Sequence, residues 1–170
     1  MTVIYIRHGN DEDDDSNYEN DPGLRQDRMK EVIKTTQELI RKWGHPDVIY
    51  VSPMYRSLQT VQLMVSQLPG FQNVGVSPNL SRYFTSKELK RGIRAIRPQT
   101  LELKVPLGED NHEFHRRIRK HHEAVKSRGW YRDDRPVVWC VTHALVMKRV
   151  SKYCHRKIPD HLDFLYYFKV

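Results

Sequence analysis

The 170-residue chain is long enough for one domain with a sizeable core and short for two, so we expect a single domain over residues 1–170. Its formal net charge of +8 favours anionic partners, namely phosphorylated small molecules, nucleic acid or acidic proteins, without choosing among them. No apolar run is long enough to span a bilayer, and the amino terminus lacks a basic segment followed by an apolar one, which predicts a soluble, cytoplasmic protein with no membrane partner.

The first expected element is a buried strand over Thr2 to Ile6, which stops abruptly at Arg7, His8 and Gly9. If that strand lies in an open α/β sheet, Arg7 and His8 emerge at its carboxyl end, where such sheets bind ligands. The alternative is that both residues simply cap a strand at the surface. The acidic segment from Asn10 to Gly23 has no periodicity and is expected to be a loop. Its carboxylates are either solvated, or close enough to the pocket to donate a proton or to repel polyanionic substrates.

Two helices and a second strand are expected next. Apolar residues recur at three-to-four spacing from Leu24 to Trp43, which predicts an amphipathic helix ending at Gly44. A strand over Val48 to Val51 precedes a helix over Met54 to Leu68, whose opening turn carries Arg56. Because a helix start favours an anion, Arg56 is a candidate phosphate ligand, with a surface ion pair as the alternative.

The middle of the chain predicts a short strand between Phe71 and Ser77 and a helix from about Ser86 to Arg97. That helix carries a basic stripe, which is by default a solvated face. If it borders the pocket, it attracts phosphorylated ligands by long-range steering that weakens as salt rises. The stripe consists of Lys87, Lys90, Arg91, Arg94 and Arg97.

A helix from about Asn111 to Ser127 is predicted to bury Phe114, Ile118 and Val125. Its other face is expected to be basic and solvated. Two of its histidines lie one turn apart, but no third ligand has suitable spacing, so no metal site is expected. The residues assigned to this outer face are His112, His115, Arg116, Arg117, Arg119, Lys120, His121 and His122.

The last third of the chain predicts a strand over Val137 to Val141, a helix from about Ala144 to Cys154 and a final strand over Phe164 to Phe168. The first of these strands ends just before His143. The inward residues of the helix are expected to be Val146, Val150 and Tyr153, and Cys140 and Cys154 are expected to be buried free thiols.

Taken together, these segments resemble the histidine phosphatase superfamily, in the branch that includes cofactor-dependent phosphoglycerate mutases and small phosphohistidine phosphatases. The resemblance implies a single three-layer α/β/α domain with a mainly parallel central sheet. We expect an enzyme that needs no metal ion, because Arg7, Arg56 and His143 already supply the positive charge, and we expect no cofactor. The matching pieces are Arg7-His8-Gly9, Ser52-Pro53 with Arg56 and Gln59-Thr60, Gly108-Glu109, and Val141-Thr142-His143.

The same resemblance implies a role for each catalytic candidate. Arg7 and Arg56 hold the phosphoryl oxygens through paired, charge-assisted hydrogen bonds. His8 becomes phosphorylated and is then freed by water, while His143 donates a hydrogen bond to the phosphoryl oxygens. Further candidates for substrate binding are Gly9, Asn10 and Ala144.

The source of the proton for the leaving group stays open at this point. Family members that hydrolyse phosphate esters usually carry an acid after the third strand, but here Arg82 stands near that place and no acid follows the strand. Asp11 occupies a position where the family usually has a hydroxyl residue, which argues against mutase activity on sugar phosphates. Glu88, Glu109 or the acidic loop could supply the proton. Alternatively, the substrate is a phosphoramidate or an aryl phosphate, whose leaving group needs less help, or catalysis is weak.

The sequence therefore predicts a metal-independent phosphatase that hydrolyses a phosphomonoester or a phosphohistidine, on a small molecule or a phosphoprotein, through a phosphohistidine intermediate on His8. The alternative is a phosphatase-like binding module for phosphorylated or nucleic-acid ligands with little turnover. Nucleic acid is compatible with the net charge but is not favoured.

Overall fold

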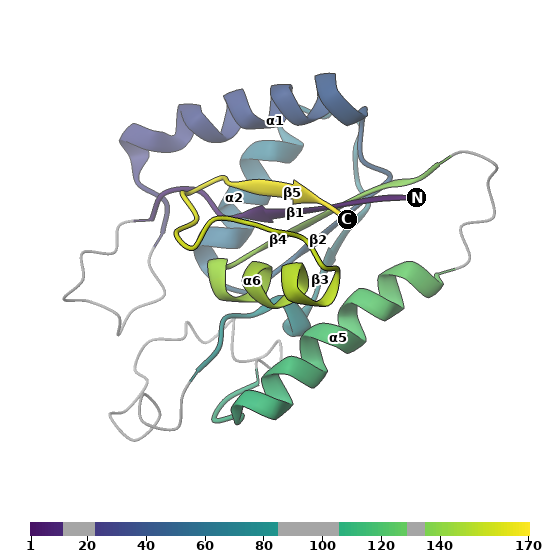
Figure 1. The fold of residues 1–170 in the computed structure, drawn as a ribbon. Coiled ribbons are helices and arrows are strands. Elements are labelled where there is room, and N and C mark those ends of the chain that lie inside the picture. Colours follow the sequence, from purple (N-terminus) through teal and green to yellow (C-terminus); the bar gives the residue numbers. More distant parts are fainter. Residues whose placement is uncertain (12–22, 85–105, 129–134) are drawn as a thin grey trace.

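A computed structural model describes residues 1–11, 23–84, 106–128 and 135–170 (Figure 1). Within these ranges the chain forms a five-stranded, mostly parallel sheet with two helices on each face. The strands are β1 (Thr2–Arg7), β2 (Val48–Val51), β3 (Val74–Val76), β4 (Val137–Thr142) and β5 (Tyr167–Lys169). The helices are α1 (Met29–Trp43), α2 (Tyr55–Val65), α5 (Asn111–Ser127) and α6 (Ala144–Tyr153), with short 3-10 turns at Gln26–Arg28 and Pro78–Leu80.

The strand order across the sheet is β3-β2-β4-β1-β5. All neighbouring strands run parallel except β5, which is antiparallel to β1 at the edge. In the register of the two central strands, Arg7 of β1 pairs with Thr142 of β4. The residues that follow them, His8 and His143, therefore leave the sheet next to one another.

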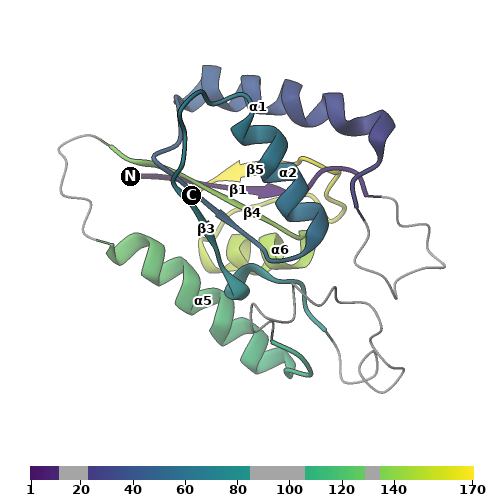
Figure 2. The same cartoon turned by 180° about the vertical axis from the view of Figure 1, so that it is seen from behind.

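Each face of the sheet buries its own apolar core, because successive strand residues point to opposite faces. One face packs under α1 and α2, and the other packs over α5 and α6 (Figure 2). In β1, Ile4 belongs to the first core and Tyr5 to the second. Burial on both faces explains why the central strands are continuously apolar. The three-layer, mainly parallel architecture predicted from the sequence is confirmed.

Two predicted elements begin at other residues than the sequence predicts. Helix α1 begins at Met29 rather than Leu24, because Leu24 forms an isolated antiparallel bridge with Asp11 and a 3-10 turn follows. Its predicted end is correct, since Gly44 adopts a φ of 86°. The last strand begins at Tyr167 rather than Phe164, because the chain first turns through Leu165 at a φ of 60°.

The prediction that α5 exposes all its basic residues is wrong, because Arg117, His121 and His122 are buried. Each histidine has polar partners from other elements. His121 Nδ1 lies 3.1 Å from Ser77 Oγ, and His122 Nδ1 lies 3.0 Å from the Tyr5 hydroxyl. Buried polar groups that are satisfied in this way do not require an exposed face.

On α6 the predicted inward position of Tyr153 is also wrong, since this side chain is exposed and lies under the Arg119 guanidinium. Met147 takes the buried place instead. The two cysteines are free as predicted, with Cys140 buried and Cys154 half-buried.

Several expectations fall outside the described residues, namely the helix at 86–97 with its basic stripe, Glu88, and most of the acidic loop. Within the described ranges, no helix combines the length and the apolar composition that a membrane crossing requires. The cytoplasmic location and the single domain over residues 1–170 stay predictions.

Candidate active site

Two histidines meet at the carboxyl edge of the sheet. The backbone N–H of His8 donates to the carbonyl of Thr142 at 2.9 Å, which fixes the end of β1 against the end of β4. The rings of His8 and His143 then lie with their centroids 5.0 Å apart, and both side chains are buried. The sheet register therefore creates a pair of adjacent imidazoles.

His8 is held in one tautomer by its own neighbour. Its Nδ1 lies 2.8 Å from the carbonyl oxygen of Gly9, and because a carbonyl only accepts, Nδ1 carries the hydrogen. In the neutral ring the lone pair is then on Nε2, which accepts a hydrogen bond from Arg56 Nε at 3.2 Å. Burial, followed by the positive charge of Arg56, holds the pKa of His8 well below its usual range. His8 is therefore a neutral base with its lone pair directed at a guanidinium.

His143 is oriented by Ser52, which follows β2. The hydroxyl of Ser52 lies 2.8 Å from His143 Nε2 and also accepts from the backbone N–H of Met54 at 3.3 Å. The other ring nitrogen, Nδ1, is buried and has no hydrogen-bond partner among the described residues. Burial first, and then the positive charge of Arg56, lower the pKa of His143 well below its usual range. This ring is also neutral near pH 7.

Arg7 is positioned by a segment near the end of the chain. Its Nη1 donates to the carbonyl of Leu162, and its Cζ lies 3.9 Å from the centroid of the Phe164 ring. The ring of Phe164 is 5.7 Å from that of His8, and the N–H of Leu165 donates to the His8 carbonyl at 3.3 Å. The segment at 162–165 therefore braces both residues of the Arg7-His8 pair.

Arg56 reaches the same place from the opening turn of α2. Besides donating to His8, its Nε lies 3.3 Å from Asp11 Oδ2, and the side chains of Arg56 and Asp11 are each only 9% exposed. The four catalytic candidates Arg7, His8, Arg56 and His143 are thus gathered at one edge. Asp11 is a carboxylate in direct contact with that group.

The turn after His8 is fixed by close packing. A Cβ on Gly9 would lie 3.0 Å from a methyl carbon of Val32, so no side chain fits without movement. The N–H of Gly9 donates to Thr60 Oγ1 at 2.9 Å, and that hydroxyl donates to the carbonyl of Arg56 at 2.7 Å. Thr60 thereby ties the turn after His8 to the helix that carries Arg56.

The remaining substrate-binding candidates contribute backbone. The carbonyl of Asn10 accepts from the N–H of Arg25 at 2.9 Å, which pins the chain as it leaves the turn. Ala144 opens α6 directly after His143, so the first-turn amides of α6 begin at the site. Helix starts of this kind favour anions.

A family model described as the histidine phosphatase superfamily (branch 1) matches residues 3–165. The chain belongs to this superfamily. The resemblance predicted from Arg7-His8-Gly9, Arg56 and His143 is therefore confirmed, and the enzyme is a phosphatase, as the sequence predicts.

Solved structures share the fold of this phosphatase at low sequence identity. It is similar to the protein histidine phosphatase SixA complexed with tungstate, at 18% identity and a TM-score of 0.64 over 97% of this chain and 84% of that one. It is similar to the ecdysone phosphate phosphatase from Bombix mori in complex with tungstate, at 14% identity and a TM-score of 0.70 over 99% and 88%. It is also similar to the mycobacterial glucosyl-3-phosphoglycerate phosphatase, at 17% identity and a TM-score of 0.67 over 99% of this chain and 88% of that one. The comparison with curated proteins finds no match.

Glu109, one of the acids that the sequence offers as a proton donor for this phosphatase, is engaged in a buried ion pair. Arg117 Nε donates to Glu109 Oε2 at 2.9 Å, and Arg117 Nη2 donates to Oε1. Arg117 Nη1 also donates to the carbonyls of Asn79 and Ser81, at 2.7 and 3.1 Å. These contacts give Glu109 a structural partner and tie α5 to the segment after β3.

That segment brings a third arginine toward the phosphatase site. The hydroxyl of Thr142 donates to the carbonyl of Leu80 at 2.7 Å, two residues before Arg82. The charge of Arg82 is one of those that lower the pKa of His143, after burial and Arg56. Its Cζ also lies 4.5 Å from the centroid of the Phe84 ring. A cation therefore stands where the family resemblance leads one to expect an acid.

Three supporting residues were identified only as parts of the motif. Ser52 holds His143, Thr60 holds Gly9, and the side-chain carbonyl of Gln59 accepts from the N–H of Leu24 at 2.7 Å. The family motif identified these three residues in the sequence, but it did not predict which groups they bind. For a metal, no group of three or more His, Cys, Asp or Glu side chains gathers among the described residues.

Proposed function

We propose that this phosphatase acts without a metal ion and through a phosphohistidine intermediate on Nε2 of His8. The observation that supports it is the hydrogen bond from His8 Nδ1 to the Gly9 carbonyl, which leaves the lone pair on Nε2. A buried, neutral imidazole with a fixed tautomer is a competent nucleophile toward phosphorus. Arg7 and Arg56 supply the positive charge that the phosphoryl oxygens need.

In the first step, the lone pair of His8 Nε2 attacks phosphorus while the bond from phosphorus to the leaving atom breaks. The phosphoryl group moves to Nε2, and the leaving oxygen or nitrogen takes up a proton. The two guanidinium groups and His143 hold the three equatorial oxygens, where charge is spread in the transition state.

His143 acts as a hydrogen-bond donor in this scheme. Because Ser52 Oγ already accepts from Met54 N, its own hydrogen can donate to His143 Nε2. The neutral ring then carries its hydrogen on the buried Nδ1, which is available to a phosphoryl oxygen. No proton needs to leave His143.

Asp11 is our candidate for the proton donor. Its carboxyl group contacts Arg56, which in turn contacts His8, so it lies next to the reacting atoms. A phosphoryl group bound at Arg56 adds negative charge beside Asp11, and this repulsion favours the protonated acid. After Asp11 has given its proton to the leaving group, its carboxylate can accept a proton from water. Water then attacks phosphorus, the bond to Nε2 breaks, and phosphate leaves with His8 restored.

For the substrate we propose a phosphomonoester or a phosphohistidine, carried by a small molecule or a phosphoprotein. Two of the similar structures are complexes with tungstate, a tetrahedral oxyanion, which agrees with a phosphoryl site in this fold. Glu109 is not retained as a proton donor, because Arg117 holds its carboxylate.

The test is to trap the intermediate. The protein is mixed with an aryl phosphate, quenched in base, where phosphohistidine survives, and its intact mass is measured with and without a chelator. We expect a phosphoryl adduct and chelator-insensitive turnover in the wild type. Both disappear in His8→Ala and persist in the matched control His112→Ala, which alters an exposed histidine of α5.

An adduct that persists in His8→Ala contradicts the assigned nucleophile. Turnover that the chelator removes and a divalent metal restores contradicts the metal-independent scheme. If neither the wild type nor the control releases phosphate, the alternative of a binding module with little turnover takes precedence.

A further inference from the structure

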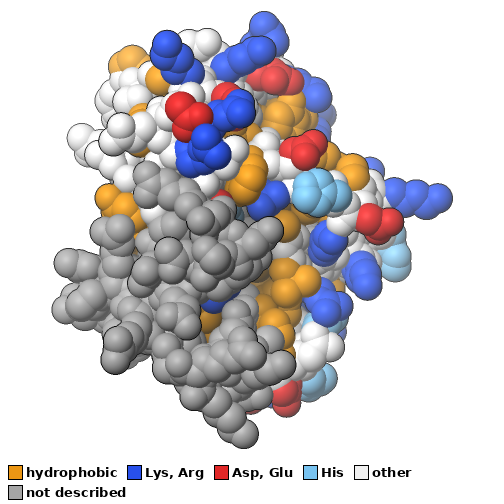
Figure 3. All heavy atoms as spheres, turned by 90° about the vertical axis from the view of Figure 1, so that its left-hand side faces the viewer, with side chains coloured by type: hydrophobic (Ala, Val, Ile, Leu, Met, Phe, Trp, Pro, Cys, Tyr) orange, Lys and Arg blue, Asp and Glu red, His pale blue; other side chains and the backbone are white. Residues whose placement is uncertain are grey.

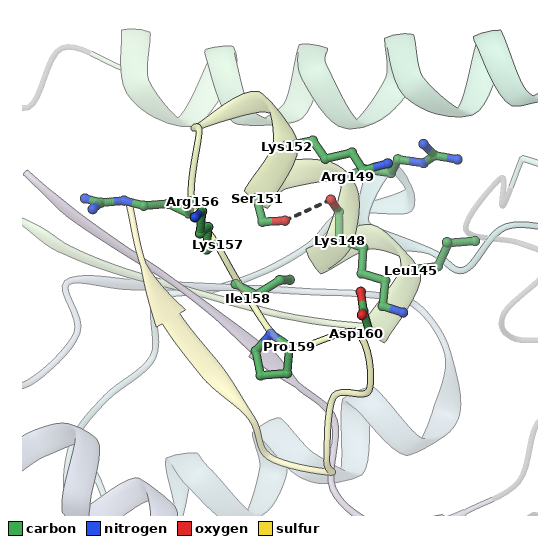
Figure 4. A pocket seen from close by; sticks show the side chains of 10 residues that line it. All are labelled: Leu145, Lys148, Arg149, Ser151, Lys152, Arg156, Lys157, Ile158, Pro159 and Asp160. Carbon is green, nitrogen blue, oxygen red and sulfur yellow. Dashed lines mark hydrogen bonds between the residues drawn. The ribbon is translucent and has the colours of Figure 1, made fainter.

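A pocket of about 530 Å³ lies between α6 and the segment at 156–160 (Figure 4). Lys148, Arg149 and Lys152 line it from α6, and Arg156 and Lys157 line it from the segment. Asp160 is the one acid among its described lining residues. The pocket is therefore strongly cationic, and its volume falls in the range of ligand sites, roughly 300–1,000 Å³.

None of the positively charged side chains of this pocket forms an ion pair with the described part of the protein. The side chains of Lys148, Lys152, Arg156 and Lys157 form no hydrogen bond or ion pair with a described residue. Arg149 donates to Asn111 Oδ1 at 3.0 Å, but its buried Nε has no acceptor among the described residues. Like charges held together in this way favour an anion from outside the chain.

The positive charge of the pocket also acts on the neighbouring helix α5. The pKa of His115, on the adjacent face of α5, is lowered by burial first and then by the charges of Arg149 and Lys152. Figure 3 looks at the carboxyl edge of the sheet, and Lys, Arg and His side chains gather along its right-hand margin. The positive charge of the pocket therefore reaches His115 on the neighbouring helix.

The spacing of the cations fits an extended peptide. Lys148 and Lys152 lie one helical turn apart on α6, about 6 Å. Alternate side chains of an extended chain are about 6.5 Å apart, so two acidic residues separated by one position can reach both lysines. Leu145 and Ile158 add apolar surface for the intervening side chains.

Single-stranded nucleic acid fits this lining less well. Single-stranded nucleic acid is usually bound on aromatic side chains that stack with its bases. None of the described lining residues is aromatic. The chemistry of the pocket is that of flexible ammonium and guanidinium groups around a partly apolar floor, which matches carboxylate side chains.

The pocket is connected to the active site by both of its walls. Helix α6 starts at the residue after His143, and Leu145 lies only two residues beyond that histidine. The other wall continues past Asp160 to Leu162 and Phe164, which contact Arg7. A peptide lying in the pocket is therefore within a few residues of the phosphoryl site.

We propose that the pocket between α6 and residues 156–160 binds an acidic peptide segment next to the phosphorylated residue of a protein substrate. The substrate part of this inference rests on the proposed function. The binding of an acidic peptide does not, because it needs no turnover.

The first experiment measures binding alone. A fluorescein-labelled, unphosphorylated peptide with alternating acidic residues is titrated with the full chain at low and moderate salt, and anisotropy is recorded. We expect saturable binding that Lys148→Glu/Lys152→Glu weakens about tenfold or more. The matched control is Lys30→Glu/Lys34→Glu, which makes the same charge change one turn apart on the exposed face of α1. The control should bind like the wild type.

The second experiment compares substrates. For a phosphopeptide with an acidic flank, we expect kcat/KM to fall about tenfold in the α6 double variant, mainly through KM, while hydrolysis of an aryl phosphate is unchanged. Equal losses in the α1 control, or an oligonucleotide that binds more tightly than the peptide, overturn the inference. Peptide binding without aryl phosphate turnover would refute the proposed function and leave the peptide site supported.

Discussion

Arg56 Nε donates a hydrogen bond to Nε2 of His8 across 3.2 Å. The atom proposed to attack phosphorus is thus covered by the group proposed to bind the phosphoryl oxygens. The same Nε lies 3.3 Å from Asp11. Substrate binding must rearrange these contacts, and each of the three side chains can be tested by a substitution.

Arg56→Lys keeps the charge but removes the fork of donors. We expect kcat/KM for an aryl phosphate to fall about 100-fold, because a single ammonium cannot offer two phosphoryl oxygens the paired donors of a guanidinium. Arg28→Lys, at an exposed arginine that pairs with Glu31, is the control and should behave like the wild type. An Arg56→Lys enzyme within about threefold of the wild type would remove Arg56 from the phosphate clamp.

Asp11→Asn tests the proton donor through the leaving group. We expect hydrolysis of an alkyl phosphate to fall about 100-fold, since a poor leaving group needs the proton. Hydrolysis of an aryl phosphate with an acidic phenol should change much less. The rates are measured for a series of aryl phosphates whose phenol leaving groups increase in pKa. Equal losses across the series would mean that Asp11 organises the site and donates no proton.

Glu109→Gln separates stability from catalysis. Breaking the buried pair with Arg117 should destabilise the fold by about 3 kcal/mol, because the guanidinium stays buried without its counter-charge. Measured below the melting transition, kcat on an aryl phosphate and on an alkyl phosphate should stay near the wild-type value. A selective loss on the alkyl phosphate, at unchanged stability, would restore Glu109 as a proton donor.

The acid limb of the rate profile should lie below the ordinary histidine range. Because the pKa values of His8 and His143 are both lowered, both rings stay neutral as the pH falls through 6.5. We expect kcat/KM for an aryl phosphate to be level from about pH 7.5 to 6.5 and to fall only in more acidic buffers. Circular dichroism in the same buffers shows whether the protein is still folded. A midpoint at or above about pH 6.5 would contradict neutral, buried histidines.

The stability of the fold should decline in mild acid, because α5 carries two buried histidines, His121 and His122. The pKa values of His121 and His122 are lowered to about 4, chiefly by burial, whereas both titrate near 6.5 in the unfolded chain. Between pH 6.5 and about pH 4 the two histidines are therefore protonated in the unfolded state but not in the folded state. The free energy of unfolding falls as the pH is lowered through this range. His121, which is more deeply buried, contributes up to about 1.4 kcal/mol per pH unit.

Urea unfolding at about pH 7.5 and pH 5 measures this loss. His121→Gln removes one titrating group, so its stability should depend less on pH than that of the wild type. His112→Gln changes an exposed histidine of the same helix and should leave the dependence as it is. Identical slopes in the wild type and His121→Gln would exclude His121 as the source.

The parts of the site that the sequence predicts are those that local chemistry determines. His8 and His143 each directly follow an apolar strand, and Arg56 lies in the first turn of a helix, so the topology of a parallel sheet places them at one edge. The predicted helix bounds around Phe114 and Ile118 are correct for the same reason, since a strong 3.6-residue period and an acidic start specify them locally.

The parts that the sequence does not predict depend on partners distant in the chain. His121 and His122 look like surface residues, but their ring nitrogens find partners inside the fold. These are the hydroxyls of Ser77 and Tyr5 and the thiols of Cys140 and Cys154. Phe164 continues an apolar run and so resembles a strand residue. Its actual place beside Arg7 follows from the way the chain turns before β5.

One of the contacts at Arg7 belongs to the main chain. The acceptor is the carbonyl oxygen of Leu162, and every amino acid placed there would still present a carbonyl. An alanine scan of this segment would report on the packing of the Leu162 side chain and miss the oxygen that holds the guanidinium. Replacing the peptide bond after Leu162 with an ester, which weakens that oxygen as an acceptor, addresses the contact directly. The carbonyl oxygen of Leu162 therefore contributes to the position of Arg7 in a way that no side-chain substitution at this position can reveal.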